Sequence, residues 1–230
     1  MSRQGLNLEK VVLLGRTLDE YTRFFALDLE SLCGRPVLDV ASGVSSFCAE
    51  AAAAGIPTTA FDRIYDFTAE EIQSRCEPDL DAVTRDIAKA RTYNWDFYKS
   101  PEGMRAYRER AYKSFLADYR LHRGTRYVAG SLPQLPFADE QFDITLTSYL
   151  LFVYEEHFDY EFHKRSVLEM LRVTRDELRC YPIVTFEAKP SAHLERLCAD
   201  PDLERFRFEV KATTFEFLHR SNKVLCITRK

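Results

Sequence analysis

Two short apolar runs, joined by an alanine-rich stretch, constrain the fold of this chain more than any other feature of its sequence. Residues 36–40 predict a buried strand that ends in a turn of small residues. Residues 45–54 predict a helix that ends at Gly55, and residues 57–62 predict a second strand. A strand, a helix and a strand within about thirty residues form a βαβ unit. Because such crossovers are right-handed and join parallel strands, the sequence predicts a parallel sheet.

The rest of the chain returns to this alternation after one long interruption. Residues 68–122 have a helical pattern far longer than an ordinary crossover, so residues 64–123 are predicted to be a helical, aromatic-rich insertion and a candidate lid over the strand ends. Further strands are expected at 127–129, 142–147, 178–186, 206–213 and 224–228, and further helices at 160–173 and 192–199. We therefore expect a single α/β domain over residues 1–230, with a Rossmann-like, doubly wound and mostly parallel sheet that ends in an antiparallel hairpin.

An N-terminal helical cap is predicted over residues 1–35, ahead of the first strand. A helical pattern runs through residues 11–32. Within it, Thr17 and Glu20 have the spacing of a capping box, in which each side chain bonds the other residue's backbone amide. Tyr21 follows on the same helix, spaced to share a face with two phenylalanines.

Composition and charge bear on the partners and the location of the protein. The 230 residues carry a net charge of −4 and are 46% hydrophobic, which is ordinary for a globular protein. Because phosphates and anionic membranes require a basic surface, we expect no nucleic-acid or membrane partner, but a small-molecule substrate. No run is long enough to span a membrane and no signal peptide is seen, so a cytoplasmic location is expected. The six cysteines are scattered, which predicts reduced core thiols and no metal site.

Three segments are expected at the carboxyl ends of the strands, where ligands of doubly wound sheets bind. The first begins at Asp39 and contains small residues that let backbone amides approach a ligand, before a helix whose N-terminus favours negative charge. The second ends at Asp62, which lies at the spacing where a carboxylate accepts the ribose hydroxyls of an adenosine. The third spans residues 129–137.

The order V-L-D-V-x-S-G, F-D and G-S-L-P-x-L-P-F-x-D-x-x-F-D in these segments resembles the class I S-adenosylmethionine (SAM)-dependent methyltransferases. The resemblance covers residues 37–173, and the C-terminal hairpin fits the same family. Further motifs resemble a bacterial subgroup of it: Gly15-Arg16-Thr17, Ser45-Ser46-Phe47, and Leu151-Phe152-Val153-Tyr154 followed by His157. The resemblance implies that SAM is bound as a cosubstrate or substrate.

The residues expected to contact SAM are Arg16, Asp39, Ala41, Ser42, Gly43, Asp62, Arg63, Ser131, Leu132, Thr147 and Ser148. By resemblance, the turn after Asp39 surrounds the methionine part, Asp62 holds the ribose, and Ser131 and Leu132 lie beside the adenine. Thr147 and Ser148 would face the reaction centre. Arg16 is either a partner of the SAM carboxylate or an exposed arginine at the start of a helix.

Four residues are candidates for the reaction itself: Tyr21, Tyr149, Tyr154 and His157. An aromatic face can hold the positively charged sulfur of SAM with about 0.5–2 kcal/mol. His157 is a candidate general base, and the alternative is a solvated loop histidine. Most aromatic residues of the insertion are expected to serve packing.

The first loop departs from the family pattern. Only Gly43 remains of three alternating glycines, the other two positions being Ala41 and Ser45. The position after Gly130, often an acid that contacts adenine, is Ser131. NAD is the competing ligand, but its G-x-G-x-x-G turn is missing from this chain.

Three functions remain open at this point. The first is methyl transfer from SAM to a small acceptor, which requires mainly alignment in a dry pocket. The second is cyclisation of SAM to azetidine-2-carboxylate with release of methylthioadenosine, as in the azetidine-2-carboxylate synthases, which have a methyltransferase-like fold. The third is a non-catalytic SAM-binding protein.

Overall fold

A mixed sheet forms the centre of the computed structural model, which describes residues 12–90 and 92–230. Within these residues the sheet has seven strands in the order β3-β2-β1-β4-β5-β7-β6. The strands are β1 (Val37–Val40), β2 (Thr58–Asp62), β3 (Tyr127–Ala129), β4 (Phe142–Ser148), β5 (Thr174–Tyr181), β6 (Phe206–Ala212) and β7 (Lys223–Arg229). Strands β1 to β5 pair in parallel, whereas β7 lies antiparallel between β5 and β6. The predicted doubly wound sheet and its C-terminal hairpin are confirmed.

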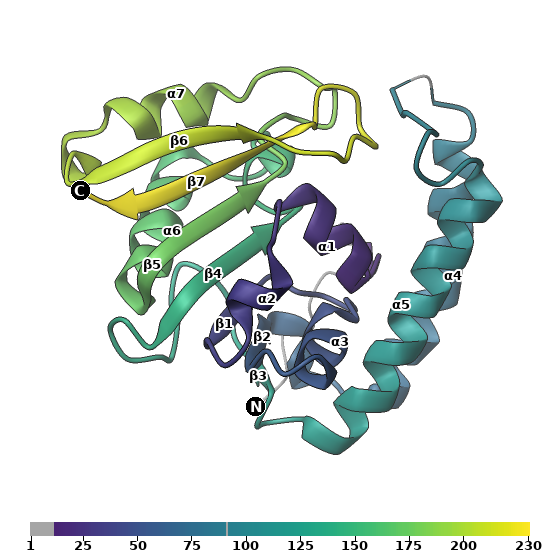
Figure 1. Ribbon diagram of the computed structural model, residues 1–230. Helices are drawn as coiled ribbons and strands as arrows, with labels where there is room; N and C mark the ends of the chain where they lie inside the picture. The colour runs from purple at the N-terminus through teal and green to yellow at the C-terminus, as the bar shows by residue number, and fades with distance from the viewer. Residues whose placement is uncertain (1–11, 91) are drawn as a thin grey trace, which may run out of the picture.

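Helices cover both faces of the sheet (Figure 1). They are α1 (Leu18–Phe24), α2 (Leu29–Leu32), α3 (Phe47–Ala53), α4 (Ala69–Ile87), α5 (Pro101–His122), α6 (Tyr160–Val173) and α7 (Ala192–Ala199), with short 3-10 turns η2 (Arg63–Asp66), η3 (Phe152–Tyr154) and η4 (Pro201–Leu203). Helices α6 and α7 pack on one face, and α1, α2 and α3 on the other. The α4–α5 hairpin stands outside α3 as a further layer.

The N-terminal segment differs from the single helix expected over residues 11–32. Val11 lies outside the described residues, residues 12–17 are not helical, and α1 is separated from α2 by Ala26, whose φ of +52° ends the helix. The predicted capping box is confirmed, because Thr17 and Glu20 bond each other's backbone amides. Within this segment, Gly15 packs closely against the turn before α3, because a Cβ there would lie 2.1 Å from the Val44 carbonyl oxygen.

The helical pattern predicted for residues 68–122 forms two helices with a non-helical connection. Helix α4 starts at a capping box made by Thr68 and Glu71, and α5 starts with Pro101 behind the Ser100 cap. The connection leaves the helical conformation where its aromatic side chains contact the loop between β6 and β7. The Tyr93 ring, for example, lies 4.7 Å from that of Phe217.

The strand predicted at residues 178–186 was placed too late in the chain. Strand β5 begins at Thr174, directly after α6, and ends at Tyr181. Residue 182 is a proline, which has no N–H to continue the ladder, and residues 182–186 therefore leave the sheet. Val184 instead pairs with Pro190 inside the following loop.

Within the part of the chain that the structure describes, no helix is both long and apolar enough to cross a membrane.

Candidate functional site at the carboxyl edge of the sheet

A buried hydrogen-bond network surrounds Asp39, near the end of β1. The Asp39 carboxylate is fully buried and accepts a 2.9 Å hydrogen bond from the Tyr21 hydroxyl and a 2.5 Å hydrogen bond from the Ser42 hydroxyl. The Tyr21 hydroxyl also lies 3.3 Å from the hydroxyl of Ser148, the last residue of β4. Four residues singled out from the sequence, on α1, β1, the first turn and β4, thus meet at one point.

The environment of Asp39 shifts its ionisation. Burial raises the pKa of the Asp39 carboxyl to about 7, although the hydrogen bonds from Ser42 and Tyr21 oppose that rise. Burial likewise raises the pKa of the Tyr21 hydroxyl well above its usual value, so this group stays protonated and donates. A positive charge next to Asp39 would favour its ionised form, because opposite charges at close range stabilise each other.

Asp62, at the end of β2, holds the first turn in place. One carboxylate oxygen accepts from the Gly43 amide at 2.9 Å, and the other accepts from the Ile64 amide at 3.0 Å. An ionised carboxylate has about four acceptor positions. Because Asp62 is only half-buried by its neighbours, the remaining positions can face a ligand. Arg63, the next residue, is exposed, and its charge works against the rise in the Asp62 pKa that burial causes.

The first turn is tight, as the sequence predicted, but the helix after it is capped by the chain itself. Ala41 and Gly43 both have positive φ, +59° and +57°. The Ser46 amide donates to the Arg16 carbonyl at 3.0 Å, and the Phe47 amide donates to the Ser45 hydroxyl at 3.1 Å. These two amides at the start of α3 are therefore already engaged within the chain.

The side chain of Arg16 lies on the ring of Tyr149, just beyond the end of β4. The guanidinium carbon is 3.6 Å from the ring centroid, and one terminal nitrogen donates to the Leu14 carbonyl at 2.8 Å. The Arg16 Nε and the Tyr149 hydroxyl are both buried without a hydrogen-bond partner among the described residues. Tyr149 also has a φ of +53°, a left-handed conformation that is strained for a non-glycine residue.

Tyr154 and His157 follow Tyr149 on the same side of the sheet. Burial raises the pKa of the Tyr154 hydroxyl, and the nearby charge of Arg16 opposes this rise, which puts Tyr154 in the neighbourhood of Arg16. The Tyr154 ring contacts those of Phe186 and His157, with centroids 4.8 and 6.0 Å apart. His157 is exposed, so its role as a base stays a prediction.

The remaining predicted contact residues are spread along the edge. Ser131 is exposed and Leu132 partly buried, in the loop after β3, whose last residue pairs with Asp62. Thr147 lies on the opposite face of β4 from Ser148, because successive strand residues alternate. Its hydroxyl is buried without a partner among the described residues, on the side that packs against α6. Thr147 therefore does not join the Asp39 network.

A buried ion pair that the sequence did not reveal fixes the segment around Arg16. Arg108 on α5 pairs with Glu20 on α1, and the two side chains are only 2% and 0% exposed. Arg108 also donates to the Gly15 carbonyl at 3.1 Å and to the Tyr98 hydroxyl at 2.5 Å. Glu20 was accounted for in the sequence by its capping box alone, and nothing in the spacing linked it to a residue 88 positions later.

The connection between α4 and α5 contacts the loop between β6 and β7 above α1. The Asn94 amide donates to the Phe217 carbonyl at 2.7 Å, and the His219 amide donates to the Thr92 carbonyl at 2.9 Å. Figure 1 shows the two segments approaching each other at the top of the molecule. Their aromatic residues join the same core cluster as Tyr21 and Tyr149. The insertion thus reaches the carboxyl edge of its own sheet.

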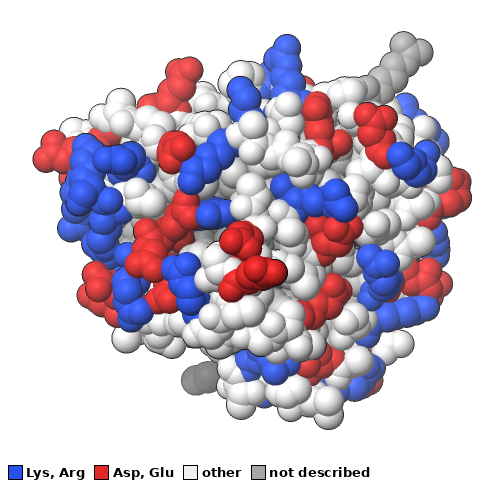
Figure 2. All heavy atoms as spheres, in the orientation of Figure 1, with Lys and Arg blue, Asp and Glu red and all other residues white. Residues whose placement is uncertain are grey.

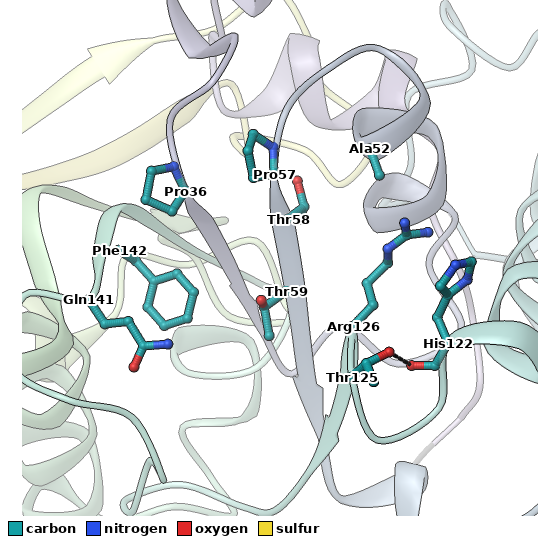
Figure 3. A pocket seen from close by; sticks show the side chains of 10 residues that line it. All are labelled: Pro36, Ala52, Pro57, Thr58, Thr59, His122, Thr125, Arg126, Gln141 and Phe142. Carbon is teal, nitrogen blue, oxygen red and sulfur yellow. Dashed lines mark hydrogen bonds between the residues drawn. The ribbon is translucent and has the colours of Figure 1, made fainter.

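A hollow lies at the opposite, amino edge of the sheet (Figure 3). Its volume is about 440 Å³, and its lining includes Pro36, Pro57, Thr58, Arg126 and Phe142. Two of its polar side chains already have partners in the chain: Thr58 donates to the Ile56 carbonyl and Arg126 pairs with Asp118. The hollow offers a ligand room, but no buried side-chain atom without a partner is found among its lining residues.

Comparison with solved structures shows the fold. Two solved structures share the fold: the apo form of the S-adenosylmethionine-dependent methyltransferase SibL (TM-score 0.50, 11% identity, 90% of this chain and 53% of that chain) and a protein from Rhodobacter sphaeroides described provisionally as a Zn-dependent alcohol dehydrogenase (TM-score 0.51, 13% identity, 97% and 96%). No family model matches the sequence. Together with the strand order, these neighbours show the Rossmann-like fold of the class I SAM-dependent methyltransferases.

The family follows from sequence. The chain is 38% identical, over 226 residues, to the protein named "Uncharacterized protein MJ0045" from Methanocaldococcus jannaschii, with 97% of this chain and 99% of that protein covered. The chain therefore belongs to the family of MJ0045. The zinc enzyme description of one structural neighbour shows that the fold alone does not decide the reaction.

Proposed function

We propose that this protein binds SAM at the carboxyl edge of β1, β2 and β4 and transfers its methyl group to a small-molecule acceptor. One observation carries the proposal: a buried hydrogen-bond network joins Asp39, Tyr21, Ser42 and Ser148 within a methyltransferase fold. Next to this network, the Asp62 carboxylate has acceptor positions that the chain does not use. SAM, when bound, supplies an electrophilic methyl group on a positively charged sulfur.

The polar groups at this edge fit such a ligand. Asp62 can accept hydroxyl groups of a ribose, and Asp39 is a buried carboxyl that a cation would ionise. The unpartnered Arg16 Nε and Tyr149 hydroxyl can donate to an anionic group. One positive group of SAM could therefore face Asp39, and its carboxylate could face Arg16. Ser131 and Leu132, next to Asp62, would border the adenine.

The chain's own residues would align the reactants rather than perform acid–base chemistry. Holding a nucleophile, a methyl carbon and a sulfur in line lowers the barrier mainly through orientation and exclusion of water. The aromatic side chains from α1, from the insertion and from the β6–β7 loop exclude water here. Tyr154, whose buried hydroxyl stays protonated, would donate a hydrogen bond to a substrate, and His157 is the group we propose for taking up a proton from an acceptor.

The acceptor is proposed to be a small molecule and not a nucleic acid or a membrane lipid. Figure 2 shows lysine and arginine side chains interspersed with aspartate and glutamate over the face that it presents, so that neither sign covers that face alone. A phosphate-rich partner would favour a continuous basic surface. The net charge of −4 supports the same choice.

The enclosure of the edge favours a second candidate reaction. Aromatic residues of the α4–α5 connection pack against the β6–β7 loop. Such an enclosure would favour a reaction that needs no additional substrate. In a cyclisation, the α-amine of SAM would attack the γ-carbon of the methionine chain, the bond from that carbon to sulfur would break, and the amine would lose a proton. The products would be azetidine-2-carboxylate and methylthioadenosine.

One incubation separates these functions. The purified protein is mixed with SAM alone, and the products are identified by mass spectrometry. Methyl transfer predicts no product until an acceptor is added, and S-adenosylhomocysteine afterwards. Methylthioadenosine with a cyclic amino acid would instead establish cyclisation. SAM binding without turnover for any acceptor in a broad panel would indicate a non-catalytic SAM-binding protein.

A binding experiment tests the site itself. Asp62→Ala should weaken SAM binding at least roughly tenfold in calorimetry, because the ribose loses a charged acceptor. The matched control is Asp66→Ala, which removes an exposed carboxylate four positions away on η2. Equal SAM affinity of the Asp62→Ala protein and the wild type, both with intact thermal unfolding, would contradict the proposed site.

A further inference from the structure

Two histidines from neighbouring helices are in contact next to the β4–α6 loop, which comprises residues 149–159. His163 lies near the start of α6 and is fully buried, and His193 lies near the start of α7 and is half-buried. Their ring centroids are 4.4 Å apart. Because α6 and α7 cover the face of the sheet opposite α1 (Figure 1), the pair lies apart from the network around Asp39.

Hydrogen bonds to the backbone show which ring nitrogen of each histidine carries a hydrogen. The His163 Nδ1 lies 2.8 Å from the Asp159 carbonyl oxygen, and the His193 Nε2 lies 3.2 Å from the Phe158 carbonyl oxygen. A carbonyl oxygen only accepts, so these nitrogens donate, and the other nitrogen of a neutral ring is bare. Those other nitrogens, His163 Nε2 and His193 Nδ1, are buried without a partner among the described residues.

The bare nitrogens limit what the pair can bind. A bare imidazole nitrogen takes up a proton or a metal ion. Within residues 12–90 and 92–230, no group of three or more histidine, cysteine, aspartate or glutamate side chains could hold a metal ion. A proton needs no third side chain, and it is therefore the ligand that fits this pair.

A positive charge on His163 is unfavourable at its place in the fold. Burial has the largest effect, and it lowers the pKa of His163 below the usual value. A charge on His193 would repel one on His163 and acts in the same direction. The positive end of the α6 dipole also disfavours the charged ring. The carboxylate of Glu155 favours the charged ring but does not cancel these effects, so His163 is uncharged at neutral pH.

The carboxylates next to the pair are engaged at the starts of the two helices. Glu155, from the loop, accepts from the hydroxyl of Ser191, the residue that caps α7. Asp159 caps α6 and accepts from the Phe162 amide at 2.8 Å. Pairing either carboxylate with a charged ring would therefore break a hydrogen bond at the start of a helix. Further titratable groups of α6 and of the segment after α7 bond one another: Tyr160, Lys164 and Asp200.

The loop contacts both rings of the pair. The Phe152 ring lies 5.9 Å from the ring of His163, and the Phe158 carbonyl accepts from His193. We propose that His163 and His193 form an acid-sensitive clasp, which holds the β4–α6 loop on α6 and α7 while His163 is uncharged and releases it when His163 takes up a proton. In the released loop, water reaches the charged ring and hydrates it.

Release of the loop would also affect the candidate site. The loop carries three of the residues proposed to act there, Tyr149, Tyr154 and His157. We therefore expect activity to fall at acid pH. Only this consequence rests on the proposed function, because the clasp is a property of the ligand-free protein.

Amide hydrogen exchange of the ligand-free protein, measured by NMR between about pH 5 and about pH 7.5, tests the clasp. The His157 and Phe158 amides both donate to the Tyr154 carbonyl, so their exchange reports opening of the loop. After correction for the intrinsic pH dependence of exchange, opening in the wild type should increase about tenfold per pH unit below about pH 6.5, because the open loop binds one more proton. His163→Gln cannot take up that proton and should show no such increase.

The matched control is His219→Gln, which removes an exposed histidine from the β6–β7 loop and should keep the wild-type pH dependence. If His163→Gln does not fold, His163→Phe keeps a ring beside Phe152 and also cannot take up a proton. Corrected exchange of the loop that is independent of pH in the wild type would overturn the clasp. An equal pH dependence in the wild type and the His163 variant would overturn it as well.

Failure of the clasp and failure of the proposed function give different results. If SAM does not bind, the proposed function fails, and the exchange experiment still decides on the clasp. If SAM binds but exchange of the loop does not respond to pH through His163, the clasp is wrong and the proposed function stands.

Discussion

The two edges of the sheet differ in how far the chain satisfies their polar groups. At the amino edge, an open hollow of about 440 Å³ has Arg126 in its lining, and this side chain already pairs with Asp118. At the carboxyl edge, Arg16 and Tyr149 have buried donors without acceptors among the described residues, and burial raises the pKa of Asp39 to about 7. Unsatisfied and perturbed groups mark a functional site better than empty volume does.

The largest expected difference between the edges is in stability. Glu20→Gln leaves Arg108 buried without a counterion, so the free energy of unfolding should fall by about 3–5 kcal/mol. At the amino edge, Arg126→Gln breaks a partly exposed pair and should cost about 1 kcal/mol or less. Urea unfolding of both variants measures this. Similar losses in the free energy of unfolding of the two variants would contradict the expected difference between the edges.

A second difference is in the dependence of stability on pH. The pKa of Asp39 is raised to about 7 in the folded protein, so the folded state binds this proton more tightly than the unfolded chain. The contribution of Asp39 is therefore favourable at acid pH and is lost as the pH rises from about 4 to 7, by about 2–4 kcal/mol. In Asp39→Asn this loss is absent. Unfolding of both proteins between pH 4 and 8 measures the change, and parallel curves would contradict the shifted pKa.

The smallest expected effect is that of a substitution at the amino edge on the affinity for a nucleoside. The Arg126→Gln protein should bind methylthioadenosine within about twofold of the wild type, since its side chain lies at the opposite end of the strands from Asp62. Titration calorimetry on the variant and the wild type gives the ratio. A loss of tenfold or more would place the nucleoside in the hollow of Figure 3.

Most of the fold could be predicted from the sequence because its determinants are local. The apolar run before Gly43, the capping box at Thr17 and the small residues around the first turn each specify their own conformation. The boundaries that were wrong depend on distant contacts. In the non-helical residues 12–17, Gly15 closely approaches Val44. The end of β5 follows from Pro182, which the apolar pattern of residues 178–186 did not reveal.

The candidate site shows the same division. Asp39, Ser42 and Ser148 were found because each ends a strand or follows one, and parallel strands bring their carboxyl ends together. The pairing of Arg108 with Glu20 and the stacking of Arg16 on Tyr149 join segments that are far apart in the chain. Such contacts depend on how the insertion packs, which no local spacing records. Thr147 was expected at the site because it lies near the end of β4, but its side chain lies on the opposite face of the sheet from Asp39. The position of a residue near a strand end does not tell on which face its side chain lies.

A crystal structure of the protein with SAM or methylthioadenosine tests the central claim most directly. We expect the ribose hydroxyls on the Asp62 carboxylate, at the carboxyl ends of β1 and β2. A nucleoside bound in the amino-edge hollow, or density at the carboxyl edge that leaves Asp62 without contact, would contradict the account.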